Sequence, residues 1–289
     1  MNRKGIILAG GMGTRLYPAT ISVCKQLLPV YDKPLIFYPL STLMTAGIRE
    51  ILIICTPSDI NLFRDLFGNG SNLGISIDYA EQSKPNGIAE AFIIGKEFLN
   101  NSPSCLILGD NIFYGNDLTK TLTKCNQDHE GATIMGYRVN DPQMYGVIEF
   151  DNNNEIVKIE EKPLKPKSNI AVTGIYFYDN TVSEKAKSLS PSKRNELEIT
   201  DLNNLYLNEN KLKYTRLNRG SAWLDTGTHE NLLEASQFIR AIEKRQGIKI
   251  ACLEEISLRF GWINQRQVDL AISKYKNSSY GSYLSKINQ

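Results

Sequence analysis

Short apolar runs alternate with longer amphipathic segments through the first half of the chain. The short runs are rich in β-branched residues and predict buried strands at residues 5–9, 50–56, 75–80, 105–108 and 132–139. The segments between them have helical spacing, at residues 35–46, 58–67, 88–99 and 118–125. Gly47 and Gly68 directly follow two of these segments, as glycine often does at the end of a helix. The alternation predicts βαβ units and a mostly parallel, Rossmann-like sheet.

The pattern changes in the second half. Strand-like runs at residues 145–150 and 155–160 flank an Asp-Asn-Asn-Asn turn, which predicts a β-hairpin and therefore a mixed sheet. Further strands are expected at residues 171–178, 214–217 and 222–224, and helices at residues 181–189, 200–207 and 229–246, the last capped by Thr228. We therefore predict an α/β, Rossmann-like three-layer sandwich at residues 1–227 and a small, mostly helical C-terminal part at residues 228–289.

The composition is that of an ordinary soluble protein. Among 289 residues, 33 Lys and Arg stand against 31 Asp and Glu, and the formal net charge is +2. This balance does not favour a nucleic acid as a partner. The apolar run from Ile6 to Ala9 is shorter than a signal-peptide core of about 7–15 residues. The apolar segment at residues 34–48 is interrupted by Pro39 and falls short of the ~20 residues that span a bilayer. We expect a cytoplasmic protein without a membrane partner.

Cysteine and histidine limit the kinds of metal site. The five cysteines are scattered without a Cys-x-x-Cys pair, so they indicate neither a disulfide framework nor a zinc cluster. His129 and His229 are the two histidines, which is little material for a histidine metal site. Any metal must therefore be held mainly by carboxylates.

A glycine-rich sequence, Leu8-Ala9-Gly10-Gly11-Met12-Gly13-Thr14-Arg15-Leu16, directly follows the first predicted strand. Ligands of open α/β sheets bind outside the carboxyl ends of the strands, so the location suits a phosphate group. The three glycines allow positive φ and let several N–H groups point at one anion, and Arg15 adds a permanently charged planar donor. Lys25 supplies a second cation nearby. We interpret this loop as a polyphosphate site.

The loop differs from the two commonest phosphate-binding patterns. Leu16 stands where G-x-G-x-x-G requires a glycine, and the pattern G-x-x-x-x-G-K-S/T does not occur in the sequence. A dehydrogenase and a P-loop enzyme are therefore disfavoured. For the loop taken alone, a tight strand-to-helix turn that needs glycine only for steric reasons is the alternative.

Asp110 and Asp225 each follow an apolar, strand-like run. A carboxylate at the end of a buried strand is costly unless it is paired or bound to a cation. Two such carboxylates could hold one Mg²⁺, which typically takes one or two carboxylates together with substrate phosphates. A loop-capping role for Asp110 and a helix-capping role for Asp225 are the alternatives.

The motifs resemble those of the glucose-1-phosphate thymidylyltransferases, a branch of the sugar-nucleotidyltransferase family. The pattern L-A-G-G-x-G-T-R-L is intact at residues 8–16, and K-x-L-L-P-V stands at residues 25–30. Further matches follow in order at residues 31–34, 82–91, 109–111, 145–147, 161–163, 223–228 and 280–284. The resemblance thus covers nearly the whole chain, and so many ordered motifs argue against a chance match.

The resemblance implies a Mg²⁺-dependent enzyme that joins dTTP and glucose 1-phosphate into dTDP-glucose and pyrophosphate, the first step toward dTDP-L-rhamnose. It implies Arg15, Lys25 and Lys162 as catalytic groups and Asp110 and Asp225 as Mg²⁺ ligands. The nucleotide site it implies in the first half of the core consists of Leu8, Gly10, Gly11, Gly13, Thr14, Arg15, Lys25, Gln26, Gln82, Gly87 and Asp110. The sugar-phosphate site it implies in the second half consists of Asn111, Tyr145, Gly146, Glu161, Lys162, Val172 and Thr173.

Regulation and assembly are also implied by the resemblance. Relatives bind a dTDP-sugar end product at a second site on a subunit interface, and the matching positions here are Gly115, Arg219, Ser221, Glu255 and Ile256. Ordinary polar surface is the alternative for these residues. The resemblance further implies a homotetramer, with oligomer and regulatory contacts in the C-terminal part.

The sequence departs from the family pattern at a few positions. Cys24 stands where relatives commonly have Ser, and Lys84 and Glu90 replace the Ser and Gln that commonly follow Gln82. Lys84 lies beside the expected base pocket and Glu90 on the following helix, and both could alter the nucleotide preference, so a UTP-using uridylyltransferase is the first alternative. A nucleotide-sugar glycosyltransferase lacks support because residues 109–111 contain no Asp-x-Asp. A non-catalytic nucleotide sensor would leave the lysines and aspartates without a common task.

Overall fold

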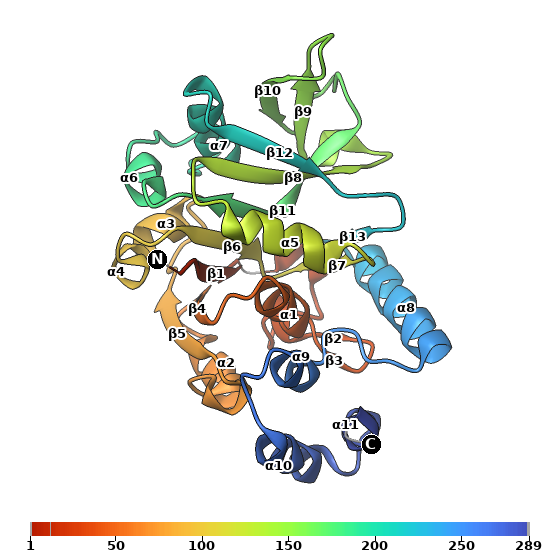
Figure 1. The fold of residues 1–289 in the computed structure, drawn as a ribbon. Coiled ribbons are helices and arrows are strands. Elements are labelled where there is room, and N and C mark those ends of the chain that lie inside the picture. The colour runs from red at the N-terminus through yellow and green to blue at the C-terminus, as the bar shows by residue number, and fades with distance from the viewer. Residues whose placement is uncertain (1, 12, 288–289) are drawn as a thin grey trace.

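A computed structural model describes residues 2–11 and 13–287 of the chain; Met12 of the glycine-rich motif lies outside the described residues. Its centre is a nine-stranded mixed sheet (Figure 1). Four neighbouring strands run parallel, in the order β6 (Ser104–Leu108), β1 (Lys4–Ala9), β4 (Glu50–Cys55) and β5 (Ser76–Glu81). The last five residues of β4 are buried in succession, as expected for a parallel strand covered on both faces.

The other half of the sheet is antiparallel around β11 (Ile170–Tyr178). This strand pairs with β6 and with β8 (Ala132–Arg138), and β8 pairs in turn with the parallel edge strand β12 (Leu212–Arg216). Near its start β11 also pairs with β9 (Gly146–Phe150), which forms the predicted hairpin with β10 (Ile156–Glu161). Strand β11 therefore joins the parallel half, where the glycine-rich loop begins, to the hairpin that ends at Glu161.

Two short ribbons lie outside the main sheet. Strand β7 (Asn111–Tyr114) pairs with β13 (Ala222–Asp225), and β2 (Pro29–Val30) pairs with β3 (Lys33–Pro34). The register of the first ribbon places Asp225 opposite Asn111. Two segments that are distant in the sequence, each with a candidate metal-binding aspartate, thus meet at one place.

Helices cover both faces of the sheet. One face is covered by α1 (Phe37–Thr45), α2 (Ile60–Phe67) and α5 (Leu118–Gln127), and the other by α3 (Glu90–Ile94), α4 (Lys96–Leu99), α6 (Val182–Lys187) and α7 (Ile199–Asn208). Ile7 belongs to the first apolar cluster and Ile6 to the second, because successive side chains of a strand point to opposite faces. Short 3-10 turns η1 (Thr14–Leu16), η2 (Lys25–Leu27), η3 (Ser71–Leu73) and η4 (Pro142–Met144) complete this three-layer core.

The C-terminal part is helical, as predicted. Helices α8 (His229–Gln246) and α9 (Leu253–Arg259) pack on the first apolar cluster through Ala235, Ile239 and Leu253. Helices α10 (Gln265–Tyr275) and α11 (Ser279–Ile287) share a separate small cluster around Tyr280 and Leu284, and Figure 1 shows them at one end of the molecule. The boundary near Gly227 stays a prediction.

Four charged side chains connect the end of α8 to the β2–β3 ribbon. Lys33 Nζ lies 2.5 Å from Asp32 Oδ1 and 2.9 Å from Glu243 Oε1. Lys249 Nζ lies 2.7 Å from Glu243 Oε2 and also contacts Asp32. Lys33 is 3% exposed and Glu243 is 4% exposed. Charges buried this deeply depend on their partners, so this cluster should stabilise the fold only while it is complete.

The observed secondary structure differs from the prediction at one helix and at short strands such as β7. The helix expected at residues 88–99 is divided into α3 and α4, because Gly95 between them has a ψ of 3°, outside the helical range. Strand β7 was not predicted, since its four residues are too short a run to be distinguished from a loop. The cap is confirmed: the Thr228 hydroxyl accepts a hydrogen bond from Asn231 N at 3.2 Å.

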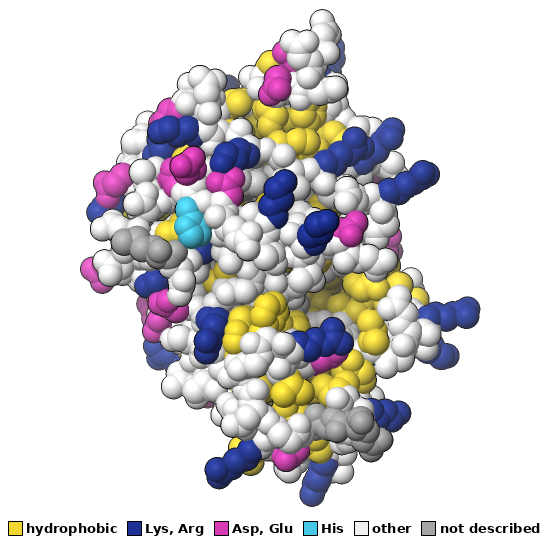
Figure 2. Space-filling view, in the orientation of Figure 1, with side chains coloured by type: hydrophobic (Ala, Val, Ile, Leu, Met, Phe, Trp, Pro, Cys, Tyr) yellow, Lys and Arg dark blue, Asp and Glu magenta, His cyan; other side chains and the backbone are white. Residues whose placement is uncertain are grey.

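The surface is mixed in charge. Figure 2 shows basic and acidic side chains interspersed over one face, in agreement with the small net charge of +2. No helix within the described part of the chain is both long and apolar enough to cross a membrane.

Candidate active site

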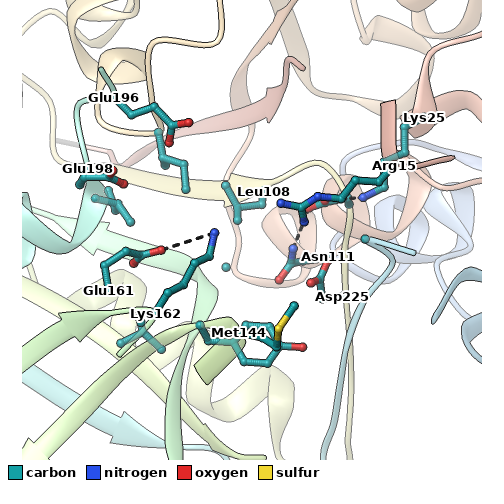
Figure 3. A pocket seen from close by; sticks show the side chains of 18 of the residues that line it. Arg15, Lys25, Leu108, Asn111, Met144, Glu161, Lys162, Glu196, Glu198 and Asp225 are labelled. Carbon is teal, nitrogen blue, oxygen red and sulfur yellow. Dashed lines mark hydrogen bonds and ion pairs between the residues drawn. The ribbon is translucent and has the colours of Figure 1, made fainter. Parts of the chain in front are cut away.

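A cavity of about 400 Å³ lies at the carboxyl ends of β1 and β6, between the glycine-rich loop and the β9–β10 hairpin. It brings together predicted residues of both substrate sites, namely Gly13, Thr14, Arg15, Lys25, Asp110, Asn111, Tyr145, Gly146, Glu161, Lys162, Val172 and Asp225. Figure 3 shows Arg15 and Lys25 on one side of this cavity and Glu161 and Lys162 on the other. The cavity therefore presents cations from two opposite walls.

The glycine-rich loop turns sharply after β1. Gly13 has a φ of 59° in the left-handed region, which glycine adopts without the steric cost of a Cβ. Its carbonyl accepts a hydrogen bond from Thr20 Oγ1 at 2.7 Å, and Leu16 is buried two residues after Thr14. These contacts anchor the loop on both sides of Arg15, whose side chain is exposed toward the cavity.

Asp110 is held by two donors. Lys25 Nζ lies 2.6 Å from its Oδ2, and Asn111 Nδ2 donates to its Oδ1 at 2.8 Å. Asn111 is itself fixed, because Trp223 Nε1 donates to its Oδ1 at 2.5 Å. A Cβ on Gly174 would lie 2.4 Å from the same oxygen, so glycine is required there. The aspartate, the lysine and the asparagine thus form one ordered group in the cavity wall.

Asp225 is the least compensated carboxyl group of the site. Burial and the neighbouring charge of Asp110 raise its pKa to about 6, although Lys25 and Arg15 act in the opposite direction. The carboxylates of Asp110 and Asp225 are neighbours whose negative charge is not fully offset by nearby cations. Such a pair of oxygen ligands fits a divalent cation such as Mg²⁺. Among the described residues, no cluster of three or more His, Cys, Asp or Glu could hold a metal ion. A cation between these two aspartates would therefore take its remaining ligands from substrate or water.

The opposite wall carries the second group of charges. Glu161 Oε2 accepts a hydrogen bond from Thr200 Oγ1 at 2.6 Å, and Lys162 Nζ lies 3.9 Å from Glu161 Oε1. Lys162 has a φ of 45°, an uncommon conformation for a residue other than glycine, and its N–H donates to Tyr145 O at 3.0 Å. The backbone turn after β10 thus directs the ammonium group into the cavity (Figure 3). Unusual backbone conformations of this kind are frequent at functional sites.

The sequence matches a known family. The model of the family "Nucleotidyl transferase" matches residues 4–242. The chain belongs to the nucleotidyl transferase family. A glucose-1-phosphate thymidylyltransferase of Xanthomonas campestris pv. campestris (strain B100) is 55% identical over 285 residues, which cover 99% of this chain and 97% of that protein. One of Neisseria gonorrhoeae is 56% identical over 281 residues, which cover 97% of this chain and 98% of that protein.

Solved structures agree with this family. A Bacillus anthracis protein described as a glucose-1-phosphate thymidylyltransferase, in complex with a sucrose, has a TM-score of 0.76 and 42% identity, with 82% of this chain and 95% of that chain covered. A UDP-glucose pyrophosphorylase complexed with UDP-glucose has a TM-score of 0.73 and 27% identity. The match covers 85% of this chain and 100% of that chain. This nucleotidyl transferase thus shares its fold with enzymes named for two different nucleotides.

Sequence reasoning missed one part of the cavity of this nucleotidyl transferase. Arg194, Glu196 and Glu198 line it, and Arg194 donates to Glu198 through Nε at 3.1 Å and Nη2 at 2.8 Å. Arg194 Nη2 also lies 3.6 Å from Glu161 Oε1. These residues belong to a charged run that is typical of a solvent-exposed loop, so the sequence alone offered no signal for them.

Several predicted site residues do not line this cavity. Gln26 and Gln82 are buried, at 4% and 6% exposed, and Thr173 is 0% exposed on the side of β11 opposite to Val172. Leu8, Gly10, Gly11 and Gly87 also lie outside its lining. The roles of these residues in binding stay predictions.

The five residues expected at a regulatory site fall into two groups. Gly115 adjoins Ser221, since a Cβ on Gly115 would lie 2.8 Å from Ser221 Oγ, and Ser221 and Arg219 line an open pocket with Arg138 and Arg216. Glu255 lines another pocket, where it accepts a hydrogen bond from Tyr283 OH at 2.6 Å, and Ile256 packs against the first apolar cluster. Whether one effector binds both groups stays a prediction.

Proposed function

We propose that this nucleotidyl transferase joins glucose 1-phosphate to dTTP and releases dTDP-glucose and pyrophosphate. One observation carries the proposal: a single cavity presents Arg15 and Lys25 on one wall and Lys162 on the facing wall, and Asp110 and Asp225 also line it. A site for one anionic substrate needs cations on one side. Cations on two sides, together with a carboxylate pair that can take a divalent ion, suit the encounter of two phosphate-bearing substrates.

The reaction needs no nucleophile from the protein. A phosphate oxygen of glucose 1-phosphate attacks the α-phosphorus of dTTP, and the new P–O bond replaces the bond to the β-phosphate. Pyrophosphate leaves with the electron pair of the broken bond. The attacking oxygen is already ionised at neutral pH, so no base has to remove a proton. Catalysis consists of aligning two polyanions and offsetting their repulsion, which is the role of Arg15, Lys25 and Lys162.

Asp110 and Asp225 would hold a Mg²⁺ ion, which when bound would offset phosphate charge and orient the triphosphate. Lys25 has a second role in this arrangement. Its ion pair with Asp110 fixes one carboxylate in position before any substrate arrives. Loss of Lys25 should therefore affect both phosphate binding and the order of the carboxylate pair.

Substrate recognition follows from the two walls. Glu161 is held by Thr200 and accepts hydrogen bonds from sugar hydroxyls. The backbone at Gly146, with Asn111, Tyr145 and Val172, completes the sugar side. On the nucleotide side, Gly10, Gly11, Gly13 and Thr14 follow the triphosphate, and Gln82 and Gly87 read the pyrimidine edge. The assignments of Gly13, Thr14, Glu161, Gly146, Asn111, Tyr145 and Val172 rest on the family resemblance together with their positions in the cavity lining. Those of Gly10, Gly11, Gln82 and Gly87 rest on the family resemblance alone.

The test is pyrophosphate release from glucose 1-phosphate with dTTP, UTP, GTP or ATP, each with and without Mg²⁺. We expect release that requires Mg²⁺ and is fastest with dTTP. Faster release with UTP would favour the alternative of a uridylyltransferase, the activity named for one structural neighbour. Binding of dTTP without pyrophosphate release would favour a nucleotide sensor. Release of a nucleoside diphosphate from a nucleotide sugar would favour a glycosyltransferase.

Regulation, assembly and context complete the proposal. A dTDP-sugar end product of the pathway toward dTDP-L-rhamnose would bind at Gly115, Arg219 and Ser221, where three arginines can meet a diphosphate.

The enzyme would be a cytoplasmic homotetramer. Apolar side chains gather in the lower half of the face in Figure 2, and large exposed ones in the C-terminal part include Leu233, Phe260 and Leu270. An unchanged initial rate in saturating dTDP-rhamnose would contradict the proposed regulation. A monomer in solution would contradict the proposed tetramer.

A further inference from the structure

The thioether of Met144 is an exposed sulfur group in the wall of the active-site cavity. Met144 is the last residue of η4, and it lines the cavity together with Tyr145 and Lys162 (Figure 3). The residue is 54% exposed, although methionine is among the residue types that proteins most often bury. Small solutes that enter the cavity can therefore reach this side chain.

The other sulfur groups of the described residues are shielded from solvent. Met44 and Met135 are 0% exposed and belong to the first apolar cluster. All five cysteines are buried as free thiols. Burial raises the pKa of each of these thiols, so the reactive thiolate form is scarce at neutral pH. Among the described residues, an oxidant in solution would therefore react first with Met144.

Met144 adjoins the wall of the cavity that carries Lys162. The turn η4 leads directly into Tyr145, whose carbonyl accepts a hydrogen bond from Lys162 N at 3.0 Å and whose ring centroid lies 5.0 Å from that of Trp223. Oxidation of the thioether would place a polar S=O oxygen, which only accepts hydrogen bonds, in this wall. That oxygen would compete with a substrate phosphate for the Lys162 ammonium group and repel the phosphate oxygens. Oxidation should therefore weaken the binding of the sugar phosphate.

We propose that Met144 is a redox-sensitive modification site, at which hydrogen peroxide reversibly lowers the activity of this nucleotidyl transferase. A lone pair of the thioether sulfur attacks one oxygen of the peroxide. The S–O bond forms as the O–O bond breaks, and after proton transfer the second oxygen leaves as water. The sulfur loses two electrons and the peroxide gains them; a methionine sulfoxide reductase with a dithiol reductant reverses the change and releases the oxygen as water. The effect on activity rests on the proposed function, whereas the modification itself does not.

The test compares the wild type with Met144→Leu and Met12→Leu, each before and after exposure to hydrogen peroxide. Leucine nearly conserves the apolar volume and has no sulfur to oxidise. Met12, the methionine of the glycine-rich motif, lies outside the described residues and is the matched control. At saturating dTTP and Mg²⁺, peroxide should lower kcat/KM for glucose 1-phosphate at least about tenfold in the wild type and in Met12→Leu, mainly through a higher KM. In Met144→Leu the loss relative to its own untreated sample should be less than about twofold.

Mass spectrometry of peptides from the treated wild type locates the modification. We expect one added oxygen atom at Met144 and none at Met44 or Met135, with an unchanged urea midpoint because the modified side chain is exposed. Methionine sulfoxide reductases with dithiothreitol should remove the added oxygen and restore the activity. A lowered urea midpoint would instead indicate general structural damage and would count against a local effect at Met144.

Three results would overturn the inference: an equal loss of activity in Met144→Leu, inactivation without added oxygen at Met144, or full activity of protein that is oxidised at Met144. The proposed function fails separately. Untreated wild-type protein that releases no pyrophosphate from dTTP would reject the proposed function and the effect on activity, while the peptide masses would still decide whether peroxide modifies Met144.

Discussion

The carboxyl group of Asp225 should make the metal-free protein less stable at neutral pH. Its pKa rises from 3.8 to about 6 on folding, chiefly through burial and then through the charge of Asp110. The folded state therefore binds this proton more tightly than the unfolded state does. The resulting stabilisation is complete below about pH 4 and is lost as the pH rises through 6. The difference between the two pKa values corresponds to about 3 kcal/mol of unfolding free energy.

Replacing Asp225 with Asn removes this pH dependence, because an amide stays neutral and can still accept the hydrogen bond from the backbone of Gly227. The measurement is urea unfolding of both proteins in EDTA between pH 4 and pH 8. Asp225→Asn should match the wild type near pH 4 and exceed its unfolding free energy by about 3 kcal/mol near pH 8. Asp65→Asn, at an exposed position of α2, should show no such trend. A difference that is constant over this range would refute the reasoning.

Three further outcomes are expected. Lys162→Ala should lower kcat/KM for pyrophosphate release by about 10²–10³-fold with an unchanged urea midpoint, and a folded variant with normal kinetics would remove this lysine from the reaction. Glu243→Gln should lower the unfolding free energy by about 3–5 kcal/mol in the same urea assay, because Lys33 would keep a buried charge with one partner fewer; a loss below about 1 kcal/mol would contradict this. Gly10→Ala should raise the KM for dTTP at least about tenfold, since the new Cβ would lie 2.5 Å from Gln82 Oε1, and an unaltered KM would show that the amide can move aside.

The sequence by itself determined the local structure and the nature of the chemistry. Alternating apolar runs and helical spacing predicted β1, β4, β5 and β6 and the helices between them, because side-chain periodicity is a local property of strands and helices. The sequence also predicted a glycine-rich loop with Arg15 directly after the first strand. This was possible because the position of a loop after a strand and the flexibility of glycine depend only on neighbouring residues. The scarcity of histidine directed attention to aspartates as possible metal ligands.

The tertiary structure alone decided which of these groups meet. Asp225 adjoins Asp110 through the β7–β13 ribbon, whose pairing connects segments that no periodicity relates. Arg194 lies in a charged run that reads as a solvated loop, yet the fold directs it to the cavity beside Glu161. The orientation of the Gln82 amide likewise depends on Glu90 and Gly87 being brought to its NH₂ end. These long-range contacts arise from packing and burial, and the raised pKa of Asp225 follows from them. Neither can be predicted from the residues that neighbour each group in the sequence.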